Sequence, residues 1–161
     1  MKGRIYLVKL IDYFYREPLM KLRIAKEKGL VLWDKKESKP YIFMVDGRIP
    51  HGGMFDRLKG LITIYAVAKT LGKDFRINWT YPFTLSKYLI SSKYNWLIDE
   101  SQMNFGIFSY HNVIAYGEYV GPNRLMKSRA KETHFYYGYN SLNEVNKVFG
   151  TNYSWGELYR E

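Results

Sequence analysis

The chain has 161 residues, 47% of them hydrophobic, so one globular domain with a sizeable core is expected. No apolar run approaches the roughly 18 residues that cross a bilayer, and the absence of cysteine excludes disulfides and thiolate chemistry. The formal charge of +10 favours anionic partners, and it does not distinguish between nucleic acid, anionic lipid and phosphorylated small molecules.

The first 28 residues form a basic aromatic segment, with eight basic residues against three acidic ones. Ile5 to Tyr15 is apolar or aromatic except at two positions, and it predicts a helix that Pro18 ends or bends. Such a helix can pack on the domain with its lysines in solvent, or it can lie in the headgroup region of a membrane. We treat residues 1–28 as this helix and residues 29–161 as the globular domain.

A β-α-β unit opens the domain. Tyr41–Val45 is a short β-branched and aromatic run, typical of a buried strand. Apolar residues then recur at helical spacing from Leu58 to about residue 71, and Phe75–Trp79 predicts a second strand. This order predicts the α/β class, with a Rossmann-like domain and a parallel sheet.

The second half is less regular. A capping threonine, three apolar runs and two serine-led patterns predict its elements. We expect a short helix from Thr84 to Leu89, strands at Tyr94–Ile98, His111–Tyr116 and His134–Tyr137, a helix opened by a Ser141–Glu144 capping box and stopped by Gly150, and a final helical turn from Ser154.

The candidate site is the connection between the first strand and the helix, Asp46 to Leu58. Gly52 and Gly53 allow close backbone approach to a ligand and free the φ angle for a sharp turn, although a simple tight turn explains them equally well. The helix start that follows favours a phosphate or a sugar oxygen. Asp56 can accept hydrogen bonds from a sugar hydroxyl, and Arg57 can pair with a phosphate.

Other patterns are weaker. The glycine connection matches neither G-x-G-x-x-G nor a Walker loop, so no dinucleotide-binding or ATPase function is indicated. His51, His111 and His134 lack metal-ligand spacing, and we expect no metal site. Asp99 and Glu100 are a weak acid/base pair. The basic run from Arg124 to Lys131 does not match an RNA-binding signature.

The segment His51-Gly-Gly-Met-Phe-Asp-Arg-Leu-Lys-Gly-Leu-Ile62, with Ala66-Val-Ala68 and the strand at residue 75, carries a family resemblance. It resembles the N-terminal half of bacterial fucosyltransferase-like glycosyltransferases, in particular proteins of surface-polysaccharide loci. Counterparts also follow at Pro82-Phe83, Lys93–Trp96, His134–Gly138 and Tyr153–Tyr159.

The resemblance implies a GT-B architecture, in which two Rossmann-like halves face a cleft. Such enzymes transfer fucose from GDP-fucose to a glycan acceptor, with inversion and without a metal or other cofactor. Carried onto this chain, the cleft residues are His51, Gly52, Gly53, Asp56 and Arg57. The resemblance also implies a cytoplasmic protein at the inner membrane surface, acting on a surface-glycan precursor.

One departure from the family is large. The His-x-Arg element that holds the GDP phosphates has no counterpart in the 161 residues. We therefore expect a domain that is truncated at its C-terminal end and inactive without the missing half. We also expect a partner to cover the apolar turn at Trp155 and Leu158. The catalytic base is not identified, and Asp56 is a candidate. The alternatives are a non-catalytic glycan- or nucleotide-binding module and, less favoured, a basic nucleic-acid-binding protein.

Overall fold

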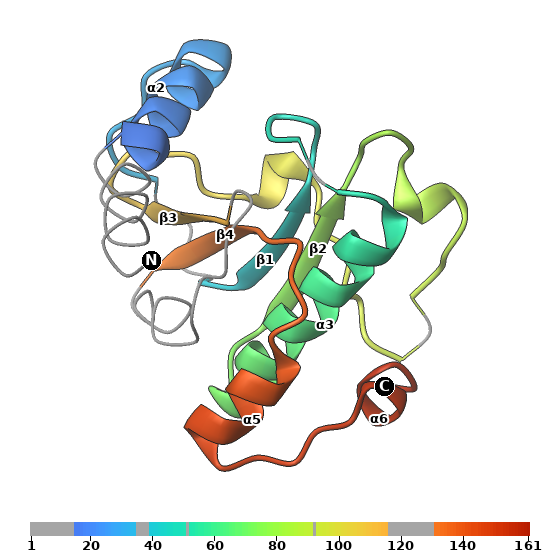
Figure 1. Ribbon diagram of the computed structural model, residues 1–161. Coiled ribbons are helices and arrows are strands. Elements are labelled where there is room, and N and C mark those ends of the chain that lie inside the picture. Colours follow the sequence, from blue (N-terminus) through green and yellow to red (C-terminus); the bar gives the residue numbers. More distant parts are fainter. Residues whose placement is uncertain (1–14, 35–38, 51, 92, 116–130) are drawn as a thin grey trace.

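The computed structural model describes residues 15–34, 39–50, 52–91, 93–115 and 131–161, which form an α/β fold around one parallel sheet (Figure 1). The strands are β1 (Tyr41–Val45), β2 (Phe75–Trp79), β3 (Tyr110–Ile114) and β4 (Glu132–Tyr136). They stand in the order β2-β1-β4-β3, and all three pairings are parallel. The predicted Rossmann-like parallel sheet is confirmed.

Helices cover both faces of the sheet. The elements are α2 (Glu17–Lys28), α3 (Met54–Thr70), α5 (Leu142–Phe149) and α6 (Trp155–Leu158), with single 3₁₀ turns η2 (Leu85–Lys87) and η3 (Glu100–Gln102). Helices α3, α5 and α6 pack together on one face, and α2 lies on the other beside β3 (Figure 1). The predicted β-α-β unit is present as β1, α3 and β2, and its two strands pair in parallel.

The strand β1 is buried along its whole length, as a central strand of a covered parallel sheet should be. Its side chains alternate between two cores. Phe43 and its neighbours at positions 41 and 45 belong to the core under α3, whereas Ile42 and Met44 belong to the core under α2. We call these two sides of the sheet the α3 face and the α2 face.

Helix α3 approaches the chain after β4 at backbone distance. A Cβ atom added to Gly60 would lie 2.0 Å from the carbonyl oxygen of Tyr137, far inside any van der Waals contact. Only glycine fits this crossing. The contact therefore fixes where the first half of α3 sits above β4, and with it the position of the helix start.

One predicted strand is wrong. Tyr94–Ile98 is not a strand, because only a single bridge from Ile77 to Leu97 joins it to β2. Pro18 lies in the first turn of α2, where the N–H that proline lacks has no helical partner. The predicted helix over residues 5–15 lies, but for its last residue, outside the described residues.

The C-terminal elements form as predicted, with different contacts. Ser141 precedes α5 without capping it, because its hydroxyl pairs with the Tyr137 hydroxyl at 2.6 Å. Gly150 ends α5 in the left-handed conformation, at φ 66°. Leu158 of α6 is 3% exposed and packs in the core of the α3 face, so this chain itself covers the turn that we expected a partner to cover. In the described part of the chain no helix is both long and apolar enough to cross a membrane.

Candidate functional site at the carboxyl edge of the sheet

The glycine connection lies at the carboxyl edge of the sheet, where open parallel sheets bind their ligands. Gly53 precedes the first residue of α3, and Asp56 lies in the first turn of that helix. The structure therefore brings Gly52, Gly53, Asp56 and Arg57 together at one helix start. His51, the fifth predicted residue, lies outside the described residues.

The two glycines have different roles. A Cβ on Gly52 would come within 2.6 Å of a carboxylate oxygen of Asp56, so this glycine leaves room for that side chain. Gly53 has φ −59° and ψ 173°, which any residue adopts, and a Cβ there would meet nothing within 4 Å. The prediction that these glycines free the φ angle is therefore wrong, because the left-handed glycine of this connection is Gly47, at φ 80°. Gly53 instead leaves open space in front of the helix start.

Arg57 ties the connection to the end of β2. Its Nε donates to the carbonyl oxygen of Gly52 at 3.1 Å, and Nη1 donates to that of Tyr81 at 3.2 Å. The guanidinium lies 5.8 Å from the centre of the Trp79 ring. Among the described residues no carboxylate forms an ion pair with Arg57, so N–H donors remain for an anionic ligand.

Asp56 is a weaker feature. Its side chain is 49% exposed, and one carboxylate oxygen lies 3.3 Å from the ammonium of Lys59. A carboxylate in the first turn of a helix also stabilises the positive helix end. This geometry allows Asp56 to meet a sugar hydroxyl, and it fits a stabilising role equally well.

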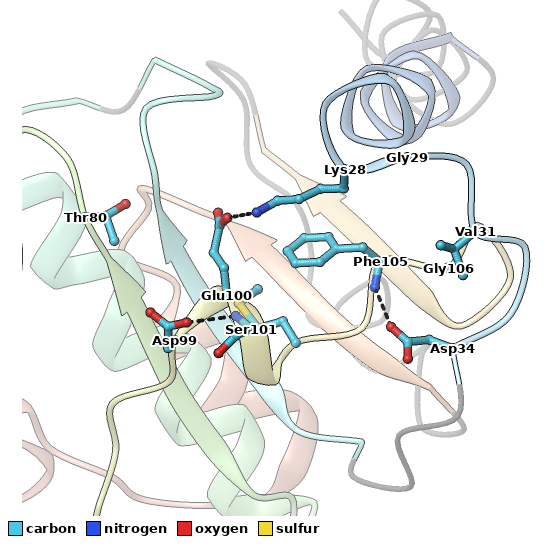
Figure 2. A pocket seen from close by; sticks show the side chains of 11 residues that line it. Lys28, Gly29, Val31, Asp34, Thr80, Asp99, Glu100, Ser101, Phe105 and Gly106 are labelled. Carbon is cyan, nitrogen blue, oxygen red and sulfur yellow. Dashed lines mark hydrogen bonds and ion pairs between the residues drawn. The ribbon is translucent and has the colours of Figure 1, made fainter.

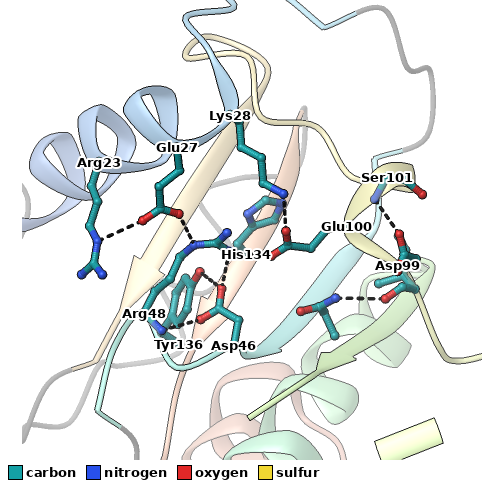
Figure 3. Close-up of polar contacts among 12 residues, drawn as sticks. Arg23, Glu27, Lys28, Asp46, Arg48, Asp99, Glu100, Ser101, His134 and Tyr136 are labelled. Carbon is teal, nitrogen blue, oxygen red and sulfur yellow. Dashed lines mark hydrogen bonds and ion pairs between the residues drawn. The ribbon is translucent and has the colours of Figure 1, made fainter. Parts of the chain in front are cut away.

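Sequence analysis missed the most connected group at this edge, a network around Arg48 (Figure 3). Nη1 of Arg48 lies 2.7 Å from a carboxylate oxygen of Asp46 and 2.7 Å from one of Glu100, and Nε lies 3.1 Å from Glu27. The Tyr136 hydroxyl donates to Asp46 at 2.9 Å. We call these five side chains the Arg48 network. It joins the end of β1 to α2, to η3 and to β4.

The contacts within the Arg48 network shift the pKa values of its members. Burial alone lowers the pKa of the Arg48 guanidinium, but Glu100 and Asp46 outweigh it and raise that pKa above its ordinary value. Burial would raise the pKa of Glu100, yet Arg48 and Lys28 together lower it. Burial, then Asp46, raises the pKa of Tyr136 well above its ordinary value, so this hydroxyl stays a donor.

An open pocket of about 710 Å³ lies beside this network (Figure 2). It is lined by Lys28, Gly29, Val31, Asp34, Thr80, Asp99, Glu100, Ser101, Met103, Phe105 and Gly106. Figure 2 shows Lys28 and Glu100 pointing toward each other, with the Phe105 ring beside them. Carboxylates and hydroxyls around an aromatic ring suit a hydroxyl-rich ligand, because the polar groups accept and donate hydrogen bonds while the ring covers an apolar face.

The adjacent acids Asp99 and Glu100 divide their roles. Asp99 accepts a hydrogen bond from the Ser101 amide at 2.8 Å, while the Gln102 side chain accepts one from the Asp99 amide at 3.1 Å. Asp99 thus caps η3, and this backbone bond is the main reason that its pKa is lowered. Glu100 belongs to the Arg48 network and lines the pocket. The two acids therefore have different hydrogen-bond partners.

The described histidines are separated by the sheet. His134 on β4 is fully buried, and its Nε2 lies 2.6 Å from a carboxylate oxygen of Glu132, which also accepts two hydrogen bonds from Asn104. Burial, with nearby lysine charge, lowers the pKa of His111 on β3. Within the described ranges no three histidine or acidic side chains converge as metal ligands.

Comparisons of this chain with protein-family models, with curated proteins and with solved structures found no match. The residues of this edge are therefore the structural basis for a proposed function.

Proposed function

We propose that this chain is the N-terminal domain of a fucosyltransferase-like glycosyltransferase of the GT-B type, which transfers a sugar from GDP-fucose to a glycan acceptor. The observation that supports this proposal is the pairing of an unobstructed helix start at Gly53 with the guanidinium of Arg57 at the carboxyl edge. A helix start and an arginine with free donors both favour a leaving diphosphate.

The pocket beside the Arg48 network supplies the second half of the proposal. Its carboxylate, hydroxyl and aromatic groups match the surface of a glycan, which offers hydroxyl donors and apolar ring faces. We assign this pocket to the acceptor and the helix start to the donor. Glu100 is the pocket carboxylate most firmly held for such a hydrogen bond, because Arg48 and Lys28 both fix it.

In the proposed reaction an acceptor hydroxyl attacks the anomeric carbon of the donor sugar. The bond to the GDP oxygen breaks, and a base takes the hydroxyl proton. Asp56 is the candidate base on this side of the cleft, since its carboxylate is exposed at the helix start. Positioning and stabilisation of the leaving diphosphate would supply most of the rate enhancement.

We further propose that turnover needs a second domain, because the 161 residues contain no His-x-Arg element for the GDP phosphates. The site of action would be the cytoplasmic surface of the inner membrane. The same sequence feature favours the alternative, a non-catalytic glycan- or nucleotide-binding module. One experiment distinguishes the enzyme domain from the binding module: adding a domain that carries the His-x-Arg element restores transfer of fucose only in the first case.

Binding calorimetry with GDP-fucose tests the donor end of the site. Arg57→Gln should weaken binding roughly tenfold, because it removes a charge-assisted hydrogen bond. Gly53→Val should also remove binding, since a Cβ at this position meets none of the described residues within 4 Å and the branched side chain would lie in the path of an approaching ligand. Gly156→Val is the matched control, because a Cβ at Gly156 likewise meets nothing within 4 Å.

Two results would contradict this proposal. Binding by Gly53→Val at the strength of the parent chain would make the connection structural only. Robust GDP-fucose turnover by the 161-residue chain alone would show that no second domain is needed.

A further inference from the structure

Exposed apolar side chains concentrate along α2 and the residues that follow it. Among them, Leu30 is 71% exposed and Trp33 is 67% exposed. We define the apolar strip by six exposed members: Leu19, Leu22, Leu30, Leu32, Trp33 and Phe108. Large exposed apolar patches on monomeric soluble proteins mark interaction sites.

The strip is held by the fold. Met20 and Ile24 anchor the opposite side of α2 in the core, so Leu19 and Leu22 face outward. The segment after α2 runs beside the loop before β3, where the Ile107 and Phe108 amides donate to the carbonyl oxygens of residues 31 and 32, both at 3.0 Å. The Trp33 and Phe108 rings pack with their centres 4.8 Å apart.

Positive charge accompanies the strip. Residues 15–33 carry five basic side chains against two acidic ones. Lys26 lies one helical turn from Leu22 on the outward side of α2, and no carboxylate of the described residues forms an ion pair with it. Arg23 is also outward and pairs with Glu27 at 3.2 Å. Basic groups beside exposed leucine and tryptophan are the composition of a surface that lies in the headgroup region of a membrane.

We propose that the apolar strip docks this protein on an anionic phospholipid surface. Leu30 and Trp33 enter between the headgroups, and Lys26 and Arg23 face the lipid phosphates. Leu30 to Trp33 are four consecutive exposed apolar residues, and such a continuous run suits a fluid apolar layer better than one rigid groove. The proposal concerns residues apart from the glycine connection and holds whether or not the chain belongs to a glycosyltransferase.

Vesicle co-sedimentation of the 161-residue chain tests this surface. The protein should sediment with vesicles that mix phosphatidylglycerol and phosphatidylcholine in equal amounts, and it should remain in solution with phosphatidylcholine alone. High salt should release it, because the charge component is screened. Brominated lipid should quench Trp33, and Trp33→Phe should lose that quenching while still sedimenting.

Matched variants separate the apolar and charge components. Leu30→Ser with Trp33→Ser should weaken binding at least about tenfold, since two large apolar side chains no longer leave water. Its control is Tyr88→Ser with Ile90→Ser, because these residues are 70% and 90% exposed but lie elsewhere. Lys26→Glu should weaken binding roughly tenfold, whereas Lys147→Glu on α5 should leave it unchanged.

Several outcomes would overturn the proposal. Equal sedimentation with neutral and mixed vesicles, or none with either, would remove the lipid as the partner. Equal loss in the strip variants and in their controls would show that the effect is not specific to the apolar strip. A dimer in light scattering that Leu30→Ser with Trp33→Ser dissolves, without vesicle binding by the parent chain, would assign the strip to a second copy. A circular dichroism spectrum like that of the parent shows that each variant is folded.

Discussion

The two faces of the sheet are built from different chemistry. The α3 face is filled by apolar side chains from all four strands, and its few buried polar groups are hydroxyls such as Thr63 and Ser141. The α2 face buries an acid, a histidine and three asparagines, and the Arg48 network lies at its carboxyl end. Buried charge costs stability unless it is paired. The α3 face therefore stabilises the fold through apolar packing, whereas the α2 face contains buried polar groups that need partners.

The largest expected effect lies on the α3 face. Gly60→Ala should cost at least about 3 kcal/mol of unfolding free energy, because its methyl group would lie 2.0 Å from the Tyr137 carbonyl oxygen and α3 would have to move. Gly53→Ala, at the start of the same helix, should change stability by less than about 0.5 kcal/mol. Urea denaturation measures both. Equal midpoints would mean that α3 does not rest on the chain after β4.

A smaller effect is expected in the Arg48 network. Arg48→Met should cost about 2 kcal/mol at neutral pH, because it leaves Asp46 and Glu100 without their shared cation. Lys147→Met on the surface of α5 is the control for loss of one positive charge, and it should change stability by less than about 0.5 kcal/mol.

The pH dependence of stability gives a second test of Arg48→Met. Arg48 and Lys28 lower the pKa of Glu100 in the folded protein below its ordinary 4.5, against the effect of burial. The unfolded chain thus binds this proton first, so the stabilisation is present above pH 4.5 and is lost as pH falls through the lower folded pKa. Arg48→Met should flatten that acid limb in urea titrations. An unchanged acid limb would remove Glu100 from the network.

The last effect appears only at alkaline pH and concerns the helix on the α2 face. Burial, with Lys131, lowers the pKa of Lys21 to about 8, and its ammonium donates to the carbonyl oxygens of Ile107 and Tyr110, both at 2.6 Å. Between that value and 10.5 the unfolded chain holds a proton that the folded chain has released, so stability rises with pH there. Lys21→Met should lose this rise in thermal melts across the alkaline range. A rise of equal size in the variant would contradict this assignment.

The sequence predicts the α3 face better than the α2 face. Apolar runs and helical spacing locate β1, α3 and β2 because these elements contact one another through local, periodic burial. The Arg48 network has no such signal. Asp46 and Arg48 are two positions apart, but the contacts made by Glu27, Glu100 and Tyr136 span 21, 52 and 90 positions, and only the arrangement of β1, α2, η3 and β4 brings them together.

The candidate site shows the same limit. The glycine pattern located the helix start correctly, because a strand, a turn and a helix follow one another along the chain. It assigned the wrong backbone conformation to Gly53, since the φ angle of a glycine is not visible in its neighbours. The pocket was missed because its lining comes from separate segments between residues 28 and 106. Asp99 and Glu100 are adjacent in sequence, yet one caps a 3₁₀ turn and the other faces Arg48.

We propose that ligands bind at the carboxyl edge of the sheet, between the start of α3 and the pocket of the α2 face. Amide chemical shifts during titration with GDP-fucose, and then with a panel of disaccharides, test it most directly. We predict shifts at residues 52–57 with the nucleotide sugar and at residues 80 and 99–101 with a disaccharide, while the amino edge around residues 73–75 stays unchanged. Ligands do not bind at this edge if the shifts are confined to the amino edge or to the surface around Ile90, or if none occurs at the carboxyl edge with any of these ligands.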